Sequence, residues 1–137
     1  NGFSLGRFNY HYQHEPIIVG WKEGQSHKCY GDRKQTTIFE FNKPLKNDEH
    51  PTMKPIDLLE YIIKNSSKKG NYIFDGFGGS GSTLIAAEHS KRRALLLEID
   101  VRYADVIVKR YANLGKLDIK VIRDGQEYSY SEILEMG

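Results

Sequence analysis

One glycine-rich stretch, residues 75–83, constrains this 137-residue chain more than any other feature. It reads Asp-Gly-Phe-Gly-Gly-Ser-Gly-Ser-Thr, follows the apolar residues 72–74 and leads into the apolar residues 84–87. This order predicts a strand, a tight turn and the start of a helix. Glycines let a ligand approach the backbone, and the free amide groups at a helix start favour a carboxylate or a phosphate. The stretch therefore predicts a cofactor-binding turn.

The ligand of such a turn can be narrowed by comparison with known glycine patterns. A P-loop has a lysine at the position of Ser82, so ATP is disfavoured. Gly79 and Gly81 supply the first pair of a dinucleotide turn, but Leu84 stands where the third glycine packs, so NAD fits less well. The apolar run 94–97 ends in Glu98, at about the separation expected for an acid that binds ribose hydroxyls. We therefore expect a ligand that contains ribose.

Three separated motifs resemble one protein family. They are the sequence His-Pro-Thr-Met-Lys-Pro at 50–55, the stretch 75–81, and Glu98 with Asp100 and Tyr103. Together they resemble the S-adenosylmethionine-binding half of bacterial and phage DNA methyltransferases that modify exocyclic amino groups. The motif order is similar to the beta-class arrangement, the segment 14–21 is also similar, and the resemblance covers roughly residues 5–115. Gly76 is a departure, because the family usually has proline there, and it loosens the turn.

The resemblance implies an α/β, Rossmann-like S-adenosylmethionine-dependent methyltransferase fold, of which this chain is the C-terminal, cofactor-binding part. It implies S-adenosylmethionine as cofactor, DNA as partner, and adenine, in preference to cytosine, as the target base. It leaves open whether the parent belongs to a restriction–modification system or to a phage. In the family, Asp75 would accept from the methionine ammonium, Ser80 and Thr83 would approach the carboxylate, and Glu98 would hold the ribose. The cofactor-binding residues expected from the resemblance are Thr52, Lys54, Asp75, Phe77, Gly79, Ser80, Gly81, Thr83 and Glu98.

Structural roles stay open for several of these residues. Asp75 is also placed to cap the turn, Phe77 to join the core and Gly81 to serve packing alone. Asp100 stands where an N-cap precedes the helical pattern of residues 101–114, so we expect it to act first as a cap.

Aromatic and basic residues alternate over residues 1–34. Rings that stack on bases and cations that meet phosphates are typical of proteins that bind single-stranded or flipped nucleotides. We expect Arg33 and Lys34 to contact DNA phosphates. The alternative is that the rings fill a sheet core, since strands are predicted at 16–21 and 36–41.

Composition excludes several classes of protein. A net charge of +2 does not by itself indicate nucleic-acid binding, and a single cysteine excludes an internal disulfide. No run approaches the roughly 20 apolar residues of a membrane span, so we expect no membrane partner and a cytoplasmic location. The spacing of His11, His14, His27 and Cys29 matches no zinc pattern, so no metal is expected.

The expected domain is single and runs over 1–137, with DNA-facing strands and loops at 1–49, the cofactor core at 50–115 and a hairpin and tail at 116–137. The four prolines, at 16, 44, 51 and 55, are nowhere adjacent. The Pro-Pro-aromatic segment on which the family holds the target base is therefore absent, and no catalytic residue is assigned. We expect that segment upstream of Asn1, in a longer parent, with this chain inactive alone. A non-enzymatic nucleic-acid-binding module and an NAD-dependent oxidoreductase fragment remain as alternatives.

Overall fold

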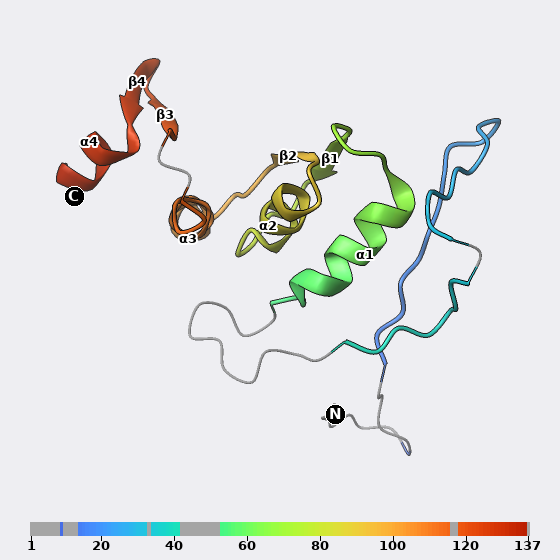
Figure 1. Cartoon of the computed structure of the whole chain (residues 1–137). Coiled ribbons are helices and arrows are strands. Elements are labelled where there is room, and N and C mark those ends of the chain that lie inside the picture. Colours follow the sequence, from blue (N-terminus) through green and yellow to red (C-terminus); the bar gives the residue numbers. More distant parts are fainter. Residues whose placement is uncertain (1–8, 10–13, 33, 42–52, 116–117, 137) are drawn as a thin grey trace.

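The computed structural model of the chain describes residues 9, 14–32, 34–41, 53–115 and 118–136. The elements in chain order are α1 (Ile56–Ser66), β1 (Tyr72–Asp75), α2 (Ser82–His89), β2 (Arg93–Leu96), α3 (Val101–Ala112), β3 (Lys120–Arg123), β4 (Gln126–Ser129) and α4 (Tyr130–Glu135), as Figure 1 shows. Helices and strands alternate from α1 to α3, which confirms the predicted α/β class.

The core contains a parallel strand pair. β1 and β2 pair with Ile73 opposite Ala94 and Asp75 opposite Leu96, and α2 is the crossover that a parallel pair needs. Because side chains alternate along a strand, these residues share the covered face of the pair. The opposite face is exposed and carries Phe74 beside Leu95.

Helix α2 lies at the centre of the described core and packs against α1, β2 and α3. Ala86 and Ala87 have no exposed surface, and Ile85 of α2 and Ile63 of α1 are also buried. Small alanine side chains let the neighbouring elements come close to the α2 backbone. The helix start expected after the glycine-rich turn is confirmed by α2, and α1 begins directly after Pro55, its N-cap.

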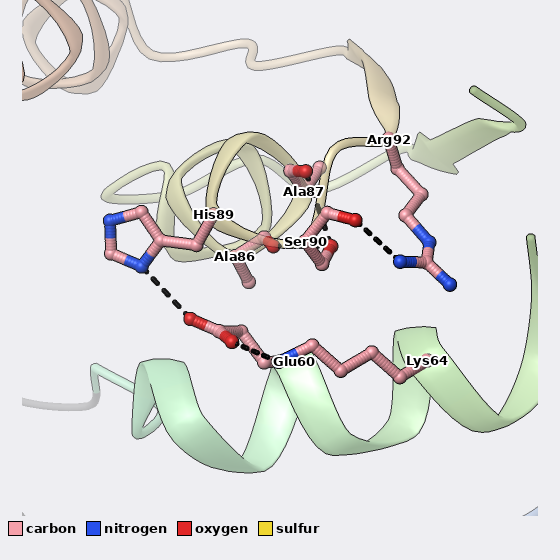
Figure 2. Close-up of polar contacts among 7 residues, drawn as sticks. All are labelled: Glu60, Lys64, Ala86, Ala87, His89, Ser90 and Arg92. Atoms are coloured by element: carbon pink, nitrogen blue, oxygen red, sulfur yellow. Dashed lines mark hydrogen bonds and ion pairs between the residues drawn. The ribbon is translucent and has the colours of Figure 1, made fainter. Parts of the chain in front are cut away.

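Polar contacts join α1 to α2 on one side of this packing (Figure 2). Glu60 accepts from the Lys64 ammonium at 2.5 Å and lies 2.9 Å from His89 Nδ1. Burial alone raises the pKa of the Glu60 carboxyl, but the hydrogen bonds and charges of Lys64 and His89 outweigh it, so the pKa lies below 4.5. Glu60 is therefore ionised at neutral pH and ties the two helices together.

The predicted strands at 16–21 and 36–41 are wrong, since the described residues 14–32 and 34–41 contain no strand. The second segment contacts α1 instead, since the Phe39 ring is 5.0 Å from that of Tyr61. Between the two segments, the Tyr30 N–H donates to the Asn65 carbonyl of α1 at 2.7 Å. A strand exists only where a neighbour takes up its backbone hydrogen bonds. In the described residues these two segments pair with no strand, so their β propensity alone did not make them strands.

The C-terminal residues form a small unit beyond α3 (Figure 1). β3 and β4 are antiparallel around Asp124 and Gly125, both with positive φ, as a two-residue hairpin turn requires. Ser129 and Glu132 form a capping box at the start of α4. None of the helices in the described part of the chain is long and apolar enough to cross a membrane.

We predict that Glu60→Gln destabilises the full chain by about 0.5–1 kcal/mol at pH 7, since it removes a partly exposed charge contact. A carboxyl with a lowered folded pKa contributes stability above its ordinary pKa, here 4.5, and loses it as the pH falls through the folded value. The difference from the unaltered chain should therefore shrink as the pH falls below 4.5 and vanish once the folded carboxyl is protonated. Urea unfolding across this pH range measures it, with Asp105→Asn on exposed α3 surface as the control. A pH-independent difference would show that packing, not charge, is lost.

Candidate cofactor site

A cavity of about 300 Å³ lies between the start of α1 and the turn that joins β1 to α2. Its lining comprises Met53, Lys54, Leu59, Asp75, Phe77, Gly78, Gly79, Ser80, Ser82 and Thr83. Six residues singled out from the sequence are thus brought together: Lys54, Asp75, Phe77, Gly79, Ser80 and Thr83. Gly81 and Glu98 are next to this group without lining the cavity, and Thr52 lies outside the described residues.

Asp75, the last residue of β1, holds the turn at its beginning. Its Oδ1 accepts from the Phe77 N–H at 2.9 Å, and its Oδ2 accepts from the Thr83 hydroxyl at 2.6 Å. The carboxylate therefore spans the turn from β1 to the first turn of α2. An ionised carboxylate has about four acceptor positions, so two protein donors leave capacity for a cation in the cavity.

The start of α2 offers free amide groups. Gly81 is the N-cap, with a φ of 78°, and no side chain caps the helix. The first amides of a helix have no partner within it, so without a cap they favour an anion. Asp75 and the start of α2 thus present opposite charges to one cavity.

Glu98 follows β2 and ties its loop to the turn from the neighbouring strand end. Its Oε2 accepts from the Gly79 N–H at 2.6 Å and its Oε1 from the Asp100 N–H at 2.9 Å. The Asp100 and Gly79 amides hold the pKa of the Glu98 carboxyl below its ordinary value. Asp100 itself accepts from the Arg102 N–H at 2.9 Å, which confirms it as the N-cap of α3.

Two glycines of the turn pack against α3. A Cβ on Gly81 would lie 3.0 Å from Ile107 Cγ1, and one on Gly78 would lie 3.2 Å from Ile107 Cδ1. Position 81 thus requires glycine for two reasons: its φ lies in the left-handed region, and Ile107 leaves little room for a Cβ. The packing role that the sequence left open for Gly81 is present in the structure.

Other predicted residues are placed differently. Phe77 is 93% exposed, so it is not a core residue, and Lys54, which lines the cavity, forms an ion pair with Glu15. Lys34 is exposed outside the cavity, with its N–H donating to the Asp32 carboxylate at 3.0 Å, and Arg33 lies outside the described residues. In the part of the chain that the structure describes, no three His, Cys, Asp or Glu residues group as metal ligands.

Sequence reasoning missed the contribution of α3 to the site. Ile107 packs on the turn, and the Arg110 guanidinium donates to the Ser80 carbonyl at 2.6 Å. Both residues lie more than twenty positions from the turn they contact, so no local pattern indicates them. Their spacing of three along a helix, which puts them on one face, was the only available signal.

Comparison with known proteins gives a consistent family. A family model described as DNA methylase matches residues 3–109. The chain is 44% identical over 62 residues to type II methyltransferase M2.DpnII of Streptococcus pneumoniae, and this match covers 45% of the chain and 23% of that protein. It is 32% identical over 111 residues to type II methyltransferase M.Cfr9I of Citrobacter freundii, covering 80% of this chain and 36% of that protein.

One similar solved structure is that of TTHA0409, a DNA modification methylase from Thermus thermophilus, complexed with S-adenosyl-L-methionine. It is 40% identical, with a TM-score of 0.43, and the match covers 44% of this chain and 25% of that one. The chain spans between 23% and 36% of the length of the two methyltransferases named above.

We predict that Gly81→Ala destabilises the chain more than Gly115→Ala. Both glycines have nearly the same φ, 78° and 79°, so each substitution costs about 1–2 kcal/mol of backbone strain. Only at Gly81 does the new methyl group meet Ile107, which adds about 1–3 kcal/mol of overpacking. Urea denaturation of the two variants measures the difference. Equal losses would show that α3 does not confine the turn in solution.

Proposed function

The chain belongs to the DNA methylase family, whose model matches residues 3–109, and on this basis we propose that it is the S-adenosylmethionine-binding part of a site-specific DNA methyltransferase. Its α/β fold, with the parallel β1–α2–β2 unit, is the Rossmann-like fold expected for such an enzyme. The type II names of the relatives favour a restriction–modification setting.

The observation that carries the proposal is the pair of opposite charges in one cavity. The amino-acid end of S-adenosylmethionine bears an ammonium and a carboxylate. Asp75 keeps acceptor capacity for the ammonium, while the uncapped start of α2 and the nearby Lys54 favour the carboxylate. The residues present therefore fit the amino-acid end of this cofactor.

We assign the ribose to Glu98 and the apolar contact to Phe77. Glu98 is an anion whose oxygens each accept one backbone N–H, which leaves acceptor positions for ribose hydroxyls. The exposed ring of Phe77 at the edge of the cavity offers a surface to the methionine chain and the ribose. A bound S-adenosylmethionine supplies an electrophilic methyl group, and the residues of this chain bind and orient it.

We propose that the acceptor is an exocyclic amino group of adenine, or of cytosine, in DNA. The groups that hold the target base belong to a Pro-Pro-aromatic segment in this family, and the printed sequence has no adjacent prolines. We assign that segment to another part of a longer protein. The exposed apolar face of Tyr72, Phe74 and Leu95 supports this, since parallel sheets are normally covered on both faces.

We also propose that the N-terminal segment contacts DNA. Trp21 is 61% exposed and its ring lies 4.8 Å from that of His27. Each of these two residues is followed in the sequence by an exposed lysine, Lys22 or Lys28. An exposed ring beside cations suits stacking on a base next to phosphates. Arg33 and Lys34 remain the proposed phosphate contacts of this segment.

We predict that Glu98→Gln weakens binding of S-adenosylhomocysteine by roughly ten- to a hundredfold, because the side chain would no longer accept two hydroxyl hydrogen bonds as an anion. Calorimetric titration of the folded variant measures the change. Asp105→Asn removes a similar charge from α3 and should leave the affinity unaltered. An unchanged dissociation constant for Glu98→Gln would remove Glu98 from the site, and tighter binding of NAD than of S-adenosylhomocysteine would contradict the proposed cofactor.

We predict that residues 1–137 alone do not transfer labelled methyl from S-adenosylmethionine to unmodified DNA, whereas a longer parent with the Pro-Pro-aromatic segment does.

In that parent, Lys34→Gln should weaken DNA binding about uniformly across sequences and flatten the salt dependence of binding by roughly one unit of slope. Scintillation counting and gel shifts at several salt concentrations provide the two measurements. Lys109→Gln on α3 is the matched control. Methyl transfer by residues 1–137 alone would contradict the assignment of the base-holding segment to another part of a longer protein.

A further inference from the structure

A single arginine on α3 contacts the glycine-rich turn three times. Arg110 Nη1 donates to the Ser80 carbonyl at 2.6 Å, to the Ser80 hydroxyl at 3.1 Å and to the Ser82 hydroxyl at 3.5 Å. Ser80 and Ser82 are both buried, and both line the cavity. Arg110 does not line the cavity, so it reaches these residues from behind.

The turn depends on such contacts because its own sequence does not fix its shape. Four of the six residues from 76 to 81 are glycines, which restrict the backbone least. Gly79 and Gly81 have φ of 52° and 78°, conformations that must be selected from a wide range. Contacts from outside the turn must therefore choose one arrangement.

Helix α3 supplies two of these contacts on one face. Ile107 fills the space beside Gly78 and Gly81, and Arg110, three residues later, fixes Ser80 and Ser82. The first contact is steric and prevents the turn from moving towards α3. The second is directional and holds the Ser80 peptide and both hydroxyls in place.

The same contacts affect the charge at the start of α2. The N-cap is Gly81, which has no side chain to bind the first amides. The Arg110 guanidinium lies within hydrogen-bonding distance of the residues on either side of this cap, so its positive charge adds to that of the helix start. Both effects act on the end of the cavity that favours an anion.

We infer that Arg110 is a positioning residue that holds the glycine-rich turn in the form that binds the amino-acid end of the cofactor. This inference rests on the proposed function. It assigns Arg110 no contact with the cofactor and no part in methyl transfer. Its loss should therefore affect ligands that carry the amino-acid end and spare those that carry only the adenosine end.

The test compares two ligands and three variants of the full chain. S-adenosylhomocysteine carries the amino-acid end, whereas 5′-methylthioadenosine lacks it. Arg110→Gln should weaken the first by about tenfold or more and the second by less than about threefold. Arg110→Lys keeps the positive charge on a side chain that reaches less far than Nη1, so it should recover part of the loss. Lys109→Gln removes the same charge from the adjacent, exposed position and should change neither affinity.

A second measurement needs no ligand. Amide hydrogen exchange in the ligand-free chain should speed up at Gly79 and Gly81 in Arg110→Gln while the amides of β1 keep their protection, because only the turn loses its anchor. Equal weakening of both ligands, or faster exchange throughout the core, would overturn the inference and leave Arg110 a purely structural residue. Unchanged affinities would also overturn it.

Failure of the proposed function has a different signature. If the unaltered chain bound neither ligand, the proposed cofactor site would be wrong, and the inference about Arg110 would be wrong with it. Normal binding by the unaltered chain and by Arg110→Gln alike would overturn the inference alone.

Discussion

The parallel pairing of β1 with β2 is the constraint on which the candidate site depends. Parallel strands end at the same edge of a sheet, so the pairing brings Asp75, at the end of β1, beside the residues that follow β2. The ladder continues past the strands: the Leu97 N–H donates to the Asp75 carbonyl, and the Gly78 N–H donates to the Leu97 carbonyl. Glu98 is then placed to accept from Gly79. Two acids distant in sequence thus lie on two sides of one turn.

The turn between them combines a backbone that only glycine adopts readily with neighbours that leave no room for other residues. Gly79 and Gly81 supply left-handed backbone, while Ile107 closes the space beside Gly81. Flexible residues gain a fixed shape only when the surroundings impose one, and here β2, α2 and α3 all take part. Because the N-cap of α2 is Gly81, the start of this helix has no side-chain cap. An uncapped helix start favours an anion, which is why we assign the cofactor's carboxylate to this end of the cavity.

The described core is small and open on one side. Its buried apolar side chains belong to α1 and α2, and the far face of the strand pair carries exposed Tyr72, Phe74 and Leu95. The strand-like segments 16–21 and 36–41 form no strand, and Phe39 of the second contacts Tyr61 of α1. A chain that spans 23–36% of its relatives' length can therefore hold the complete turn while leaving apolar surface uncovered.

The sequence by itself determined the local features. The glycine spacing predicted the turn and the start of α2, the helical pattern of residues 101–114 predicted α3, and Asp100 was the expected cap of α3. Each of these features depends on residues within one or two turns of the chain. Tertiary structure decided the rest. Whether residues 16–21 form a strand depends on a neighbouring strand, which the local sequence does not encode. The contacts of Glu98 with Gly79 and of Arg110 with Ser80 depend on how β2 and α3 pack, since hydrogen bonds across 19 and 30 residues form only when the fold brings their atoms together.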